Sequence, residues 1–189
     1  MNARAAVSLW AAASLGCAAS ADAAEVLATE VTHIEDRYAV NFDVRLAAPP
    51  ERLKRYLTDY ANYASYFDSI RESRVLGRTR DGALRVHLRL YSCVLFFCRS
   101  ATVVKDVTER PDGTITARIE PDLSDFREAT EHWRIVPDRG QTRLLYQAQL
   151  VPKFYVPPLV GPWLLKRHIR RTLEYSAVKL ETLANEKPQ

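Results

Sequence analysis

Four histidines are the first side chains to consider for chemistry: His33, His87, His132 and His168. No G-x-S-x-G, H-E-x-x-H or glycine-rich phosphate loop accompanies them. On alternating strands His87 and His132 would point away from their apolar neighbours, which predicts solvated positions. No carboxylate stands at a fixed spacing to complete an acid–base pair. The sequence therefore predicts no catalytic group, no metal site and no cofactor.

Aromatic side chains are more informative, and they are expected to converge near the mouth between the helices and a sheet. One interpretation is an ordinary aromatic core. The other is an incompletely filled cavity for a long or ring-shaped apolar molecule, with tyrosine hydroxyls available to a polar head such as a quinone carbonyl or a carboxylate. The predicted ligand contacts are aromatic and aliphatic side chains: Phe42, Tyr63, Tyr66, Phe67, Val86, Leu88, Trp133, Tyr146, Trp163, Leu165 and Ile169.

The clearest element that could position these side chains is a helix over residues 157–184. Apolar residues at positions 165, 169, 173, 177, 180 and 184 share one helical face. At a rise of 1.5 Å per residue such a helix spans roughly 30–40 Å. A long helix with one apolar face needs a sheet to lie on. We expect the strands to curve around this helix and an apolar ligand to occupy the space between them.

The alternation of apolar and polar residues predicts the strands. Residues 32–46 are expected to form one long half-buried strand, followed by helices over 50–58 and 60–67. Six further strands are expected at residues 70–78, 84–91, 99–108, 115–119, 130–137 and 143–151. Because short turns connect these six, they imply an antiparallel meander, and the first strand is expected to join an edge.

The N-terminal residues 1–24 have the layout of a secretory signal peptide. Arg4 precedes an apolar run, and small residues follow it. We expect cleavage between Ala21 and Glu25, which leaves residues 25–189 as one domain in the periplasm or outside the cell. The alternatives are an uncleaved anchor, for which the apolar run is short, and a lipoprotein that uses Cys17.

Cys93 and Cys98 are expected to form a disulfide. Their spacing excludes a C-x-x-C redox motif, and no second Cys/His pair completes a zinc site. In an oxidising compartment two cysteines at the neck of a short loop are plausible partners. Closing so small a loop adds roughly 2 kcal/mol in the chain-entropy model. The alternative is two separate buried thiols.

Surface features indicate possible partners. The net charge of +4 is too small and too dispersed to predict nucleic-acid binding. Apolar side chains at a hairpin tip beside basic residues on the last helix suit docking on an anionic membrane. The alternative is that the tip folds over the core and the basic residues are a solvated helix face. The oligomeric state is not indicated. The predicted membrane contacts are Phe96, Phe97, Lys166, Arg167 and Arg170.

The order strand, two short helices, six strands and long helix resembles the helix-grip fold. Residues 57–76 are similar to the segment where START-like polyketide cyclase and coenzyme-Q-binding (Coq10-like) proteins enter their sheet. Residues 130–146, with Trp133 and a turn at Gly140, resemble their late hairpin, and residues 151–163 resemble the approach to their last helix. The resemblance to this SRPBCC superfamily covers nearly all of the mature chain. It implies an α+β fold in which a curved antiparallel sheet of about seven strands surrounds a long C-terminal helix.

The resemblance implies two alternative functions. The first is an exported binding or carrier protein for a lipid, quinone or other hydrophobic small molecule, held between the sheet and the C-terminal helix. The second is a polyketide cyclase or dehydratase-like enzyme that positions a reactive substrate in the same cavity. The enzyme requires a titratable side chain in the cavity, for which Tyr38, Tyr146 and His87 are candidates. A third possibility is an interaction module whose core is solidly packed.

Overall fold

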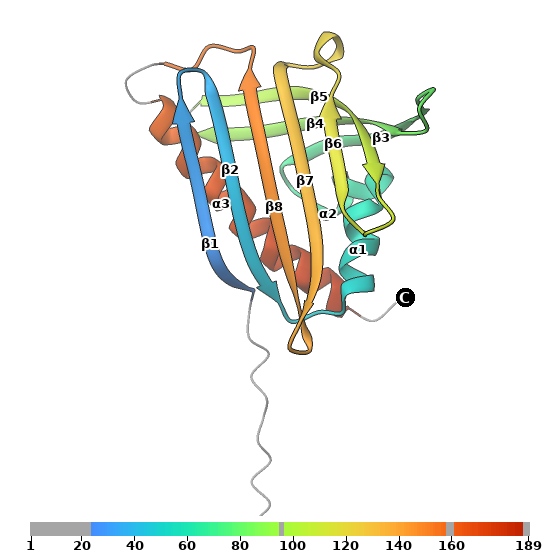
Figure 1. Ribbon diagram of the computed structural model, residues 1–189. Helices are drawn as coiled ribbons and strands as arrows, with labels where there is room; N and C mark the ends of the chain where they lie inside the picture. Colours follow the sequence, from blue (N-terminus) through green and yellow to red (C-terminus); the bar gives the residue numbers. More distant parts are fainter. Residues whose placement is uncertain (1–23, 95–96, 158–160, 187–189) are drawn as a thin grey trace, which may run out of the picture.

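The computed structural model describes residues 24–94, 97–157 and 161–186. A single antiparallel sheet has eight strands in the order β1-β2-β8-β7-β6-β5-β4-β3. Figure 1 shows the sheet curving around the long helix α3, with β3, β4 and β5 running across the others and the short helices gathered at one side. The predicted α+β helix-grip fold is confirmed.

The elements alternate along the chain as a meander with one helical insertion. The strands are β1 (Glu25–Ile34), β2 (Arg37–Leu46), β3 (Ile70–Arg78), β4 (Leu84–Val94), β5 (Phe97–Glu109), β6 (Ile115–Ile119), β7 (Phe126–Asp138) and β8 (Gln141–Pro152). The helices are α1 (Pro50–Thr58), α2 (Tyr63–Tyr66) and α3 (Gly161–Asn185), with short 3-10 helices η1 (Tyr60–Asn62) and η2 (Pro121–Leu123).

The expected first strand is a hairpin of two strands, so the prediction of one long strand is wrong. Ile34 pairs with Arg37, and the intervening Glu35 has a φ of 58°. Ile34 is 71% exposed at this turn instead of facing the core. The turn residues are Glu35 and Asp36, so no glycine or proline marks the turn in the sequence. The sheet therefore has eight strands instead of about seven, and β1 occupies the edge.

The helical insertion closes one end of the sheet. α1 begins at Pro50, whose missing N–H is harmless in the first turn, and it buries Leu53 and Leu57. The predicted second helix is divided into η1 and α2. Tyr60 of η1 is buried, while the rings of α2 are partly exposed.

The core consists of two main clusters of buried side chains. The first combines the C-terminal half of α3 (Ala177, Leu180, Ala184) with α1 and with the inward faces of β2 and β8. The second joins Tyr60 to the inward faces of β4, β5 and β6, and none of its buried members comes from α3. Trp133 packs against both clusters. The two halves of the core therefore meet at this indole.

Polar contacts fix the C-terminal end of α3 at the corner between β2 and α1. The buried Glu181 carboxylate accepts a hydrogen bond from the Ala47 N–H at 2.5 Å. The Asn185 amide donates to the Ala47 carbonyl at 2.9 Å, and Arg52 donates to the Ala184 carbonyl at 3.2 Å. This end of the helix is held by both apolar packing and hydrogen bonds.

The structure contains the predicted Cys93–Cys98 disulfide. The two residues are direct cross-strand partners of β4 and β5. Phe96 lies outside the described residues, as does the side chain of Phe97. Of the predicted signal peptide, residues 1–24, the structure describes only Ala24. The signal peptide therefore stays a prediction.

Replacing Leu53 tests the first core cluster. Its side chain is 0% exposed, so Leu53→Ala should leave a cavity and lower the free energy of unfolding by about 2–5 kcal/mol, measured by urea denaturation. Leu123→Ala in η2 is the matched control, because Leu123 is 51% exposed. Its change should stay within about 0.5 kcal/mol. Equal effects of both substitutions would contradict the packing of α1 described above.

Candidate functional site

An ion pair lies on the inward face of the central strands. The β5 alternation places Lys105 on the same face as Val103 and Val107, and its direct partners on the neighbouring strands, Val86 and Ile119, are buried. Lys105 Nζ is 2.7 Å from Oε2 of Glu131 on β7, and the two side chains are only 11% and 19% exposed.

A charged pair in this position needs a reason other than stability. Removing two charges from water costs several kcal/mol per ion, and an apolar pair of similar volume is often neutral or stabilising in its place. A few converging polar groups on a mostly apolar surface are also the usual feature that orients a bound ligand. Lys105 and Glu131 are therefore the centre of the candidate site.

Aromatic side chains surround Glu131. Trp133 Nε1 donates to Glu131 Oε2 at 3.3 Å. The Trp133 ring lies against the Tyr146 ring with centroids 3.9 Å apart, at the point where β7 pairs with β8. From the helical side, the Tyr63 hydroxyl donates to the Leu57 carbonyl at 2.5 Å, and its ring is 5.2 Å from that of Tyr60.

Burial keeps the surrounding phenols neutral. It raises the pKa of Tyr146 well above the ordinary 10.0, and the negative charge of Glu131 adds to the effect. The pKa of Tyr63 is raised well above 10.0 for the same first reason, with further contributions from Tyr60 and Glu131. The pKa of Tyr60 is also raised by burial, then by Glu131 and Glu109. These hydroxyls therefore remain hydrogen-bond donors at neutral pH.

Tyr63 and Tyr146 are only half-buried, although they belong to the interior aromatic group. Both hydroxyls are desolvated by surrounding protein, yet both residues keep part of their surface accessible. The Tyr146 hydroxyl makes no hydrogen bond within the described part of the chain, and the residue as a whole is half-buried. Partly accessible rings at this depth close the junction between the helices and the sheet less tightly than fully buried side chains would.

A hollow of about 300 Å³ lies between α3 and the segment that precedes β3. Phe67, one of the predicted ligand contacts, lines it and packs edge-on against Tyr63 with centroids 5.5 Å apart. The Tyr175 hydroxyl donates to Asp68 at 2.9 Å within this hollow. Phe67 therefore connects the hollow to the interior aromatic side chains.

His168 of α3 also lines this hollow. Its Nε2 lies 2.5 Å from the Ser92 hydroxyl of β4 and 3.4 Å from that of Thr172. Burial lowers the pKa of His168 below 6.5, so the imidazole is neutral at pH 7. The contact with Ser92 joins the middle of α3 to the β4 end of the sheet.

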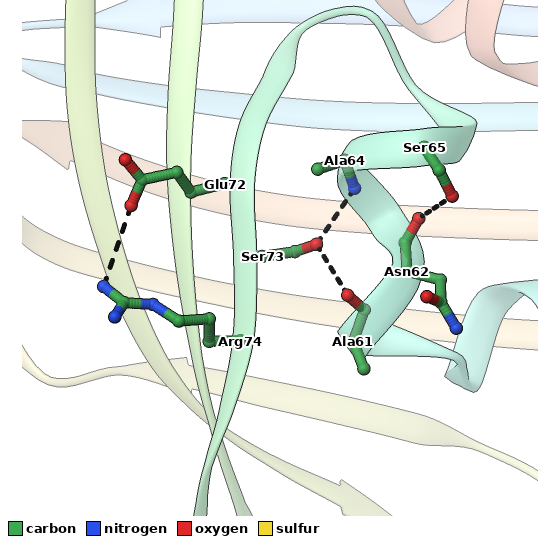
Figure 2. Close-up of a pocket in the computed structure, with 7 residues that line it drawn as sticks. All are labelled: Ala61, Asn62, Ala64, Ser65, Glu72, Ser73 and Arg74. Atoms are coloured by element: carbon green, nitrogen blue, oxygen red, sulfur yellow. Dashed lines mark hydrogen bonds and ion pairs between the residues drawn. The ribbon is translucent and has the colours of Figure 1, made fainter.

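A second hollow, of about 420 Å³, lies between the η1–α2 turn and β3. Figure 2 shows that Ser73 points toward this turn, while Glu72 and Arg74 point away from it. The Ser73 hydroxyl accepts from the Ala64 N–H at 2.9 Å and donates to the Ala61 carbonyl at 3.1 Å. The lining is small and polar, so this hollow is a joint between helix and strand and not an apolar site.

Apart from Phe67, which lines the hollow described above, the predicted ligand contacts fall into three groups. Tyr63, Trp133 and Tyr146 come together around Glu131. Phe42, Val86 and Leu88 are buried within the core clusters, and Ile169 packs on a small third cluster with Val31, Val40 and Ala148.

The remaining predicted contacts lie nearer the surface. Tyr66 is hydrogen-bonded to Asp59 at 2.6 Å, and Leu165 is half-buried. Trp163 is 57% exposed, with the Arg167 guanidinium 5.5 Å from its ring. Trp163 therefore does not join the interior aromatic group.

The titratable residues proposed for an enzyme have different surroundings. Tyr38 is 1% exposed, and its hydroxyl has no partner among the described residues. His87 lies between Arg74 and Val104 on the neighbouring strands, and its enclosed Nδ1 has no partner there either. As expected, His87 points away from the buried Val86 and Leu88, although it is only half-buried, whereas His132 is exposed.

Sequence reasoning missed Lys105 and Glu131. The signal was present, because strand alternation places Lys105 between two inward-facing valines and Glu131 two residues from Trp133. A charged residue in phase with the apolar face of a strand is the pattern that would have found them. Within the described residues no three His, Cys, Asp or Glu side chains are placed to hold a metal ion. None of the helices described there is long and apolar enough to cross a bilayer.

The family model described as "Polyketide cyclase / dehydrase and lipid transport" matches residues 37–184. The chain belongs to this family. The matched range runs from β2 almost to the end of α3, so it includes the ion pair and every predicted ligand contact. The family description names lipid transport and polyketide cyclisation, and both concern hydrophobic small molecules. A search of curated proteins finds no match.

Solved structures share the START-like fold of this family member at low sequence identity. The STAR-related lipid transfer protein of Xanthomonas axonopodis is 19% identical with a TM-score of 0.60, over 87% of this chain and 100% of that one. The Zhui aromatase/cyclase of Streptomyces sp. R1128 is 18% identical with a TM-score of 0.60, over 78% and 93%. A START superfamily protein of Mycobacterium smegmatis is 21% identical with a TM-score of 0.57, over 75% and 98%. These likenesses show the fold alone.

Titration of Tyr146 gives the stability a defined pH dependence. Its pKa is raised in the folded protein, so below the ordinary pKa of 10.0 both states keep the proton and the contribution to stability is complete. As the pH rises further, the unfolded chain loses the proton first and the free energy of unfolding falls. Tyr146→Phe should flatten this fall in urea denaturation between about pH 9 and 11. Tyr155→Phe, at a residue 78% exposed, should keep the wild-type slope. Identical slopes in wild type and Tyr146→Phe would contradict the enclosure of this hydroxyl.

Proposed function

We propose that this protein is an exported binding or carrier protein that holds a hydrophobic small molecule, such as a lipid or a quinone, between the sheet and α3. One observation carries the proposal: the Lys105–Glu131 ion pair lies among aromatic side chains on the inward face of the sheet. Membership of a family described by lipid transport and polyketide cyclisation supports it.

Binding would depend on burial of apolar surface without covalent chemistry. Burial of a ligand's apolar surface contributes about 25 cal/mol per Å². The Trp133 and Tyr146 rings present broad faces to a flat or chain-like ligand. The neutral phenols and the ion pair would contact its polar part, so that the ligand has a defined orientation.

The proposed export rests on two independent features. Residues 1–24 have the order of segments typical of a secretory signal peptide. The Cys93–Cys98 disulfide suits an oxidising compartment, since such bonds are rare where glutathione and thioredoxin keep thiols reduced. Together they support a location in the periplasm or outside the cell.

The alternative function is a polyketide cyclase or dehydratase-like enzyme that uses the same space. The Lys105–Glu131 pair favours it, because such an enzyme needs a titratable group facing its substrate. In that case the Glu131 carboxylate would accept a proton from carbon or oxygen, and the neutral Tyr146 hydroxyl would donate to a carbonyl. Ligand exchange without chemical change distinguishes the carrier from the enzyme.

Native mass spectrometry of the protein recovered from the periplasm of its own host tests the proposal. The expected mass corresponds to cleavage between Ala21 and Glu25, with a non-covalently bound lipophilic molecule. Trp133→Ala should retain about tenfold less of that molecule, because a large contact surface is lost. Leu123→Ala, at a residue 51% exposed, should retain the wild-type amount. Full-length protein confined to the cytoplasm would end the export proposal. An empty wild type would end the carrier proposal, and release of a chemically altered ligand would favour the enzyme.

Peripheral contact with an anionic membrane is a second part of the proposed function. Tyr155 and Trp163 are 78% and 57% exposed on either side of the start of α3, and Arg167 covers the Trp163 ring. Arg170 is exposed as well, although it also donates to the Thr29 carbonyl at 3.3 Å. Exposed aromatic rings beside arginines are typical of surfaces that lie at a lipid–water boundary. Lys166, on the first turns of α3, would extend this surface. Phe96 and Phe97 remain predicted contacts, since their side chains lie outside the described residues.

Sedimentation with vesicles tests the membrane contact. Trp163→Ser combined with Arg167→Gln should weaken binding to phosphatidylglycerol-containing vesicles by at least about fivefold, because each basic side chain near such a surface contributes about 1 kcal/mol. Phe96→Asp and Phe97→Asp should also weaken it. Arg110→Gln, in the exposed turn after β5, is the charge-matched control and should change it little. Unchanged binding in all of the first three variants would contradict the contact.

A further inference from the structure

The buried ion pair leaves part of its hydrogen-bonding capacity unused. Lys105 Nζ and Trp133 Nε1 both reach Oε2 of Glu131, at 2.7 and 3.3 Å. Among the described residues both hydrogen bonds to this carboxylate end on Oε2, and none ends on Oε1. An ammonium group carries three donors, and within the described residues Lys105 uses one of them. The pair therefore offers an acceptor and donors side by side.

Tyr146 adds a neutral group to the same place. Its ring stacks on Trp133, and the Trp133 indole N–H donates to Glu131, so Tyr146 lies one side chain away from the pair. The hydroxyl makes no hydrogen bond within the described residues. It can donate to, or accept from, a group that lies beside the ion pair.

We propose that this ion pair selects a ligand whose polar head is a neutral hydroxyl, as in an alcohol, a phenol or an enol, an inference that rests on the proposed binding function. A hydroxyl donates one proton and accepts others. It can donate to Glu131 Oε1 and accept from Lys105 Nζ at once. The head matches both members of the pair and adds no charge to an interior in which the two charges already balance.

Other heads fit the same atoms less well. A carboxylate would accept from Lys105, but its charge would lie next to the Glu131 carboxylate in a poorly solvated space. An ammonium head would compete with Lys105 for Glu131. A hydrocarbon would displace water from the unused donors and acceptor without replacing its hydrogen bonds. A site built to bind a hydroxyl rejects the analogue that lacks it for this reason.

Displacement of the fluorescent probe N-phenyl-1-naphthylamine by three ligands with one alkyl chain tests the proposal. The competitors are octylphenol, octylbenzene and octylbenzoic acid at neutral pH, which differ only in the head group. In the wild type, octylphenol should compete at least about tenfold better than either of the others, a ratio expected from one or two satisfied hydrogen bonds.

Two variants at the ion pair should change this ranking in different directions. Glu131→Gln keeps the shape and leaves Lys105 as an unbalanced charge, so octylbenzoic acid should become the best competitor. Lys105→Met with Glu131→Leu removes both charges, so octylbenzene should compete as well as octylphenol. Apolar replacement of a buried pair is generally tolerated, and circular dichroism verifies the fold. Should the double variant not fold, the Glu131→Gln result decides alone.

The matched control is an ion pair on the other face of the sheet. Arg143 of β8 donates to Asp43 of β2, and Arg143→Gln with Asp43→Asn should leave the wild-type ranking unchanged. Equal competition by the three ligands in the wild type, or a ranking unchanged by Glu131→Gln, would overturn the hydroxyl proposal while leaving the binding function intact. A wild type that binds neither the probe nor any competitor would overturn both.

Discussion

A curved sheet presents more inward surface than one straight helix can cover, and the rest of this structure follows from that mismatch. The C-terminal half of α3 fills the concave side over β2 and β8, where its small residues Ala177 and Ala184 allow close approach. The inward faces of β4, β5 and β6 have no buried α3 residue against them. They are covered by η1, whose Tyr60 enters the second cluster. Two separately packed regions are thus brought together under one sheet.

The candidate site lies where these regions meet. Trp133 contacts both clusters, and Tyr146 contacts the first cluster and the small cluster near Ile169. Broad rings at such a boundary can touch each neighbour without filling the volume between them. The Lys105–Glu131 pair lies on the same face and is linked to Trp133 through Glu131. The junction of the two clusters is therefore also where the buried ion pair lies.

The sequence could predict those elements whose structure is decided by the local alternation of apolar and polar residues. The alternation in β2 and β4 and the helical period of α3 mark one-sided burial, so these elements and the fold class could be predicted. The turn at Glu35 could not be predicted, because its positive φ depends on the pairing of β1 with β2 and not on a glycine. Tryptophan is a residue type expected in a core, but the exposure of Trp163 is decided by where α3 begins relative to the sheet.

The ion pair shows the limit of the same reasoning at the site. Lys105 and Glu131 are separated along the chain by the strand β6 and two turns. Each alone looks like an isolated charged residue at a position where the strand pattern expects an apolar one. Only the register, which brings both to one face of the sheet, turns two apparent exceptions into a single feature. Charge in phase with an apolar pattern is therefore better treated as a candidate site than as noise. The local pattern of a single sequence does not show which strands pair or in which register.

The contacts along α3 are unevenly distributed, and this bears on how a ligand could reach the interior. Apart from Gly161, the buried residues of α3 all lie from Ala177 onward, where Glu181 and Asn185 hold the β2–α1 corner. Toward the other end, the contacts across the hollow near Phe67 include single hydrogen bonds such as Tyr175 with Asp68 and His168 with Ser92. Regions with few buried apolar contacts open at lower free energy than the core. The fold thus places its fully buried α3 residues at the end of the helix remote from Trp163, while the part beside the hollow combines partly buried apolar side chains, such as Ile169 and Leu173, with polar contacts.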